Sequence, residues 1–128
     1  MNEVDILRSG LKSMHEMLDQ AVTEMTADQW NYWPTEGGVS AFFSLWHYVR
    51  TEDNIVQFVI QRKSTSWLDG GFDTEFDLHR TAQGTGMTPE EAMAVQMMDT
   101  SRWLDYQTEV WAATDTYLQG INVADLHS

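Results

Sequence analysis

The chain has 128 residues, enough for one domain with a substantial core and too few for two. It carries 20 acidic and 7 basic residues, and its formal net charge of −13 repels both nucleic-acid phosphates and anionic membrane surfaces. It contains no cysteine, which excludes disulfides, thiolate nucleophiles and zinc–cysteine clusters and is typical of a reducing cytoplasm. We therefore expect one cytoplasmic domain over residues 1–128 that binds neither nucleic acid nor membranes.

The first predicted element is a helix over residues 4–25. Its apolar side chains recur at steps of three and four, which places them on one face: Val4, Leu7, Leu11, Met14, Leu18, Val22 and Met25. His15 lies beside this face and is expected to be a partly buried boundary residue. Thr26-Ala27-Asp28-Gln29 then has the form of a capping box, which predicts one more helical turn before Pro34 blocks further helix.

The second predicted helix starts at the N-cap Ser40 and runs to about Lys63. Glu52 and Asp53 interrupt its apolar stripe, where a bundle helix that carries no functional site would usually have Leu or Ala. A polar seam with helical spacing lies beside the stripe and consists of Ser40, Ser44, His47, Thr51 and Asn54. This helix is therefore the segment on which we expect a functional site.

Residues 64–87 show no periodicity and predict a long crossover connection. Thr88-Pro89-Glu90-Glu91 is a strong helix start, because Thr is an N-cap, Pro fits the first turn and Glu favours the positive end of the helix dipole. A third helix is predicted from there to Leu118. Three long helices with one apolar face each would leave a face for a fourth helix or a partner chain.

His47 is the strongest candidate ligand, because it lies mid-helix in the polar seam and five residues before Glu52. Neutral imidazole is the commonest protein ligand for transition metals, and a nearby carboxylate can orient it or complete a site. The alternative is a histidine at the core edge that bonds Ser44 or Thr51, with the two acidic residues forming an exposed pair. The other histidines are weaker candidates: His15, His79 and His127.

Several motifs in this order resemble the DinB-like superfamily. They are the run from Met25 to Pro34, then Gly37-Gly38-Val39-Ser40, then Leu45-Trp46-His47-Tyr48-Val49 followed by Glu52-Asp53, and the Thr-Pro-Glu-Glu helix start. Members of that family typically show an acidic turn, a Pro, a Gly-Ser helix start and a Trp-His or Ala-His dipeptide followed by acidic residues. The resemblance covers roughly residues 4–118.

The resemblance implies a four-helix bundle with a crossover connection, in which three histidines hold a divalent metal ion, Ni or Zn in our expectation. One of the three corresponds to His47. The other two form a His-x-x-x-His pair on the fourth helix, and this sequence contains no such pair. The resemblance therefore implies a chain without that helix: truncated, shortened, or completed by association.

Two functions are open from the sequence. The first is a metal-dependent enzyme of the DinB-like type, either a thiol-cofactor transferase or a hydrolase, whose metal acts as a Lewis acid or lowers the pKa of a bound thiol or water. The second is a non-catalytic helical module that acts through homodimerisation, because a large apolar face marks an interaction site. A metal-free small-molecule pocket formed by Trp33, Trp46 and the crossover is a further reading, against ordinary core packing of the same aromatics.

Overall fold

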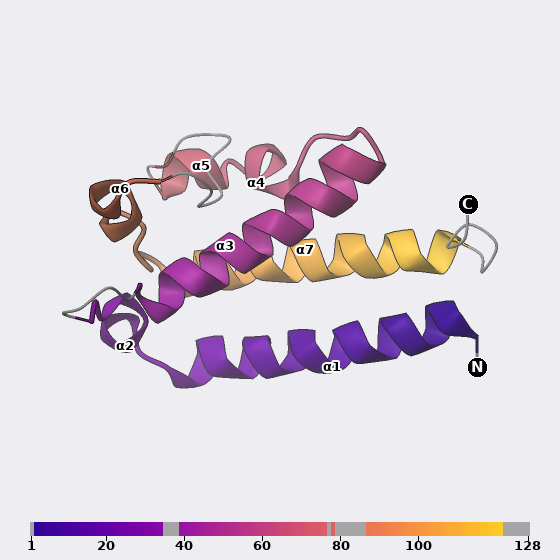
Figure 1. The fold of residues 1–128 in the computed structure, drawn as a ribbon, viewed down its shortest axis with the longest axis horizontal. Helices are drawn as coiled ribbons and strands as arrows, with labels where there is room; N and C mark the ends of the chain where they lie inside the picture. Colours follow the sequence, from indigo (N-terminus) through magenta and orange to yellow (C-terminus); the bar gives the residue numbers. More distant parts are fainter. Residues whose placement is uncertain (1, 35–38, 77, 79–86, 122–128) are drawn as a thin grey trace.

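The computed structural model describes residues 2–34, 39–76, 78 and 87–121, and Figure 1 shows their arrangement. Every regular element in these ranges is a helix, so the predicted all-α fold is confirmed. Three of the helices are long: α1 (Glu3–Glu24), α3 (Ala41–Asp53) and α7 (Thr100–Gly120). None of the helices described here combines the length and the apolar character that a membrane span requires.

Helix α7 packs against both other long helices (Figure 1). α1 runs antiparallel to α7, and α3 crosses α7 obliquely. The short helices α4 (Ser66–Asp69) and α5 (Phe72–Glu75) follow α3 and lie on the side away from α1. α2 (Ala27–Asn31) and α6 (Pro89–Met93) lie at the end of the molecule where α1 finishes and α7 begins.

The core between these helices is largely aromatic. Trp103 meets Phe42 edge to face with ring centroids 4.9 Å apart, and Tyr106 meets Trp67 at 5.2 Å. Large rings dominate the energetics of small cores, so these contacts join α3, α4 and α7. The fully buried aromatic side chains are Phe42, Trp46, Trp67, Phe72, Trp103 and Tyr106.

The prediction of one continuous second helix is only partly right. Ser40 caps it as expected, because its hydroxyl accepts from the Phe43 amide at 3.0 Å, but α-helical geometry ends at Asp53. Residues Asn54–Ile60 continue as a π-helix, η1. Four of these seven residues are β-branched, which lowers the preference of the segment for the α-helix.

The prediction of one continuous third helix is wrong in its first half, because α6 and α7 are separated by a non-helical segment. Asn31 of α2 binds that segment through Met97: Asn31 Nδ2 donates to the Met97 carbonyl at 3.0 Å, and the Met97 amide donates to Asn31 Oδ1 at 2.6 Å. Asp99 then caps a new helix, since its side chain accepts from the Arg102 amide at 3.1 Å. The Met97 backbone is thus hydrogen-bonded to α2 and is not available for the hydrogen bonds of a continuous helix.

The predicted crossover contains two short helices, and buried Asp53 anchors the first of them. Asp53 is 1% exposed; its Oδ1 accepts from the Ser66 amide at 2.9 Å, and its Oδ2 accepts from the Trp67 amide at 3.0 Å. The Tyr106 hydroxyl also donates to Oδ2 at 2.8 Å, which ties α7 to the same carboxylate. Burial, and after it the charge of Asp53, raises the pKa of Tyr106 well above its usual value. One carboxylate therefore holds α3, α4 and α7 together.

We predict that Asp53→Ala lowers the free energy of unfolding by about 3–5 kcal/mol, because it leaves buried donors without their acceptor. Guanidinium denaturation followed by circular dichroism measures this loss. Asp28→Ala is the control, since Asp28 is exposed on α2 and its loss should leave stability unchanged. Equal stabilities of the two variants would contradict the anchoring role.

Candidate functional site

The structure places His47 on the partly exposed side of α3. Its ring stacks on that of Phe43, with centroids 6.3 Å apart and planes 12° from parallel. Thr51 lies one turn on, as expected, but its hydroxyl donates to the His47 backbone carbonyl at 2.6 Å. Within the described residues, no group of three or more His, Asp or Glu side chains is arranged to hold a metal ion. His79 and His127, the weaker candidates, lie outside the described residues.

Glu52 faces the interior and joins three helices, so the reading of Glu52 and Asp53 as an exposed pair is wrong. Glu52 is 9% exposed, and the Tyr48 hydroxyl one turn earlier on α3 donates to its Oε1 at 2.8 Å. Thr114 of α7 donates to Oε2 at 2.7 Å. His15 of α1 places Nε2 3.0 Å from Oε1. The carboxylate that we expected to accompany His47 thus binds His15.

The ring of His15 is fixed by a second contact, with Trp111. The two rings stack with centroids 3.7 Å apart and planes 5° from parallel, and His15 is only 8% exposed. Trp111 is held in turn by Asp19, whose Oδ1 accepts from the indole Nε1 at 2.9 Å and from Gln107 Nε2 at 2.8 Å. Both the edge and the face of the imidazole are therefore positioned by other helices.

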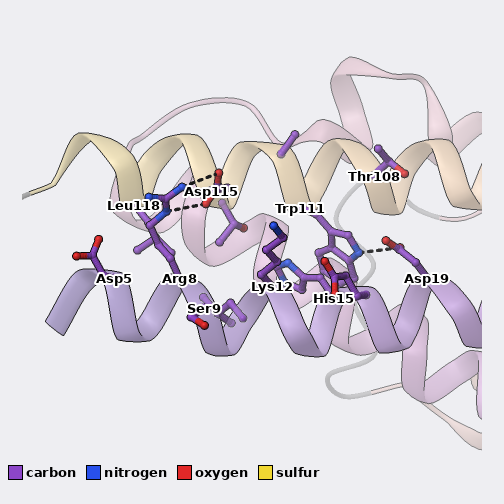
Figure 2. Close-up of a pocket in the computed structure, with 14 residues that line it drawn as sticks. Asp5, Arg8, Ser9, Lys12, His15, Asp19, Thr108, Trp111, Asp115 and Leu118 are labelled. Atoms are coloured by element: carbon purple, nitrogen blue, oxygen red, sulfur yellow. Dashed lines mark hydrogen bonds and ion pairs between the residues drawn. The ribbon is translucent and has the colours of Figure 1, made fainter. Parts of the chain in front are cut away.

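His15 lies in a groove of about 570 Å³ between α1 and α7 (Figure 2). Its lining residues are Asp5, Arg8, Ser9, Leu11, Lys12, His15, Glu16, Asp19, Thr108, Trp111, Ala112, Thr114, Asp115 and Leu118. Arg8 and Asp115 form an ion pair across it, with Arg8 Nε 2.8 Å from Asp115 Oδ1 and Nη2 3.2 Å from Oδ2. The Arg8 guanidinium holds the pKa of the Asp115 carboxyl below its usual value. We call this concave surface the α1–α7 groove.

The second ring nitrogen of His15, Nδ1, keeps contact with solvent, and His15 lines the groove. A carboxylate can only accept hydrogen bonds, so in the neutral imidazole the proton lies on Nε2, toward Glu52, and Nδ1 is an acceptor. No described residue bonds Nδ1. Within the same residues, the side-chain polar atoms sealed from solvent without a partner are the indole nitrogens of Trp30, Trp46 and Trp67. Nδ1 is not among them, so it is not fully sealed from solvent.

No known protein family model matches the chain, and no curated protein matches it. The DinB-like resemblance stays a prediction.

His15 is a weaker candidate than His47 from the sequence because the partner that distinguishes His15 is distant in the chain. Glu52 lies 37 residues away, and Thr114 lies 62 residues beyond Glu52. One signal was present: an acidic residue within an apolar stripe needs a donor from another helix. His15, beside the apolar face of the first helix, was such a donor.

The stability of the chain should fall in alkaline solution, because burial, and after it the charge of Glu52, raises the pKa of Tyr48. An unfolded tyrosine loses its proton near pH 10, so above about that pH the free energy of unfolding decreases until the folded pKa is passed. Tyr48→Phe should reduce this decrease, and buried Tyr106 should account for the remainder.

Urea midpoints measured at about pH 9 and about pH 11 give the size of the effect. Tyr32→Phe is the control, since Tyr32 is 68% exposed and lies outside the Glu52 network. An identical alkaline decrease in wild type and Tyr48→Phe would show that the Tyr48 proton does not contribute.

Proposed function

We propose that the chain binds a small polar molecule in the α1–α7 groove and that His15 accepts a hydrogen bond or a proton from it. The carrying observation is the constraint on the His15 ring: Glu52 holds Nε2, Trp111 covers one face, and Nδ1 is left open. Small-molecule sites are concave and orient their ligands with a few placed polar groups. A positioned acceptor in a groove of this size fits that description of a small-molecule site.

Glu52 acts in this proposal as a positioning residue. A carboxylate on one imidazole nitrogen fixes the tautomer and makes the other nitrogen more basic. Glu52 is itself held by the hydroxyls of Tyr48 and Thr114, so its direction is set by two further helical residues. The same arrangement supports general-base chemistry, in which His15 takes a proton from a bound molecule.

Binding of three four-carbon probes of different charge tests the proposal: 1,4-butanediol, succinate and 1,4-diaminobutane. We expect at least one of them to shift the NMR signals of the His15 ring and the Trp111 indole N–H. His15→Ala should weaken that binding by about tenfold, a loss within the usual range for one hydrogen bond. His47→Ala is the matched control, because it removes an imidazole that does not line the groove.

Two results would contradict the proposal. One is that none of the three probes binds at millimolar concentration. The other is that folded His15→Ala binds a probe as tightly as wild type does.

A second proposal rests on the DinB-like resemblance: His47 is a ligand of Ni or Zn in a metal-dependent enzyme of the thiol-transferase or hydrolase type. The partly exposed position of His47 favours this proposal; the neighbouring Trp46, by contrast, is fully buried. The described residues do not complete a ligand set around His47, so we derive no chemistry through a metal there.

The accompanying homodimer proposal is supported by the apolar surface of η1. Four of its residues are each 45–52% exposed, namely Ile55, Phe58, Val59 and Ile60. Exposed apolar residues that adjoin one another mark surfaces suited to a protein partner. A second copy of the chain is the occupant we propose.

Native mass spectrometry of protein purified with added Ni²⁺ or Zn²⁺ tests the metal-ligand proposal and the homodimer proposal together. We expect a dimer that contains metal, and His47→Ala should lose the metal but keep the dimer. Phe58→Glu should lose the dimer, because it places a charge in the apolar surface. A metal-free species would count against the first proposal, and a monomer against the second.

A further inference from the structure

Charge in the α1–α7 groove is unevenly paired. Arg8 is engaged by Asp115 through two short contacts. Lys12 is the other basic side chain of the groove, and three more carboxylates line it. These belong to Asp5, Glu16 and Asp19. Because the whole chain also carries a net charge of −13, the groove favours cations.

Two open acceptors lie one helical turn apart in this groove. His15 and Asp19 are four residues apart on α1, which brings their side chains to the same face at roughly 5–6 Å between Cβ atoms. Asp19 uses Oδ1 for both Trp111 and Gln107, and no described residue bonds its Oδ2. His15 is 8% exposed and its Nδ1 is likewise without a partner among the described residues. The first acceptor is neutral and the second is anionic.

The acceptor pair discriminates between kinds of ligand. A primary ammonium has three donors and can satisfy both atoms together, whereas a hydroxyl has one donor and a carboxylate has none. A carboxylate would also be repelled by Asp19. The groove volume of about 570 Å³ is within the range of small-molecule sites and leaves room for an extended chain beyond the ammonium.

We infer that the α1–α7 groove binds a small organic cation with a primary ammonium group, which donates to His15 Nδ1 and Asp19 Oδ2. This inference rests on the proposed function of the groove and names the class of its ligand. Glu52 keeps His15 in the accepting tautomer, so the buried network determines which molecules the groove takes.

Calorimetric titration with the three four-carbon probes tests the inference on the full chain. We expect 1,4-diaminobutane to bind about tenfold or more tightly than 1,4-butanediol, and succinate not to bind. Asp19→Asn should weaken diamine binding by about tenfold, while the amide oxygen can still accept from Trp111 and Gln107. Asp28→Asn removes the same charge from exposed α2 and should change binding by less than about twofold.

Lys12→Gln gives a second test that leaves the hydrogen-bond network intact. It removes a positive charge that repels the ammonium groups and should tighten diamine binding by roughly two- to threefold. Weaker or unchanged binding in this variant would overturn the inference even if Asp19→Asn failed to fold.

The possible outcomes distinguish the ammonium assignment from the proposal that the groove binds a small molecule. Binding of the diol or of succinate in preference to the diamine, with dependence on His15, would overturn the ammonium assignment and leave the groove as a binding site. Binding of none of the three probes would overturn both. An equal effect of Asp28→Asn and Asp19→Asn would show that the overall charge, and no local ammonium site, attracts the diamine.

Discussion

The buried carboxylate of Glu52 is the constraint on which the candidate site depends. An ionised group inside a protein is costly unless hydrogen bonds replace its water, and three helices supply those bonds here. His15 comes from α1, Tyr48 from α3 itself and Thr114 from α7. The bond between His15 and Glu52 links α1 to α3, while each of these helices also packs on α7. The site therefore exists only when all three long helices are in place.

Glu52 and Asp53 show how two adjacent residues of the same charge serve different parts of one fold. Successive residues of an α-helix point roughly 100° apart, so the two carboxylates leave α3 in different directions. Glu52 reaches α1 and α7 and positions His15, whereas Asp53 binds the first amides of α4 and the Tyr106 hydroxyl. The pair thus connects the groove on one side of α3 with the crossover on the other.

The sequence predicted what depends on local pattern and missed what depends on distant partners. Apolar spacing and capping residues located α1, the turn of α2, the starts of α3 and α6, and the all-α class. The break before α7 could not be predicted, because it depends on the bond between Asn31 and Met97, which lie 66 residues apart. The polar interruption at Glu52 was recognised, but its partner was assigned within the same helix. Periodicity places residues on a face and does not say which helix meets that face.

The shared acceptor at Glu52 has a consequence for how this chain can vary. Residues in one hydrogen-bond network do not contribute independently, so the effects of substitutions within it are not additive. A chain with an apolar residue in place of Glu52 would leave His15, Tyr48 and Thr114 without their shared acceptor. The four positions are therefore energetically coupled, although His15 and Thr114 lie far from Glu52 in the sequence.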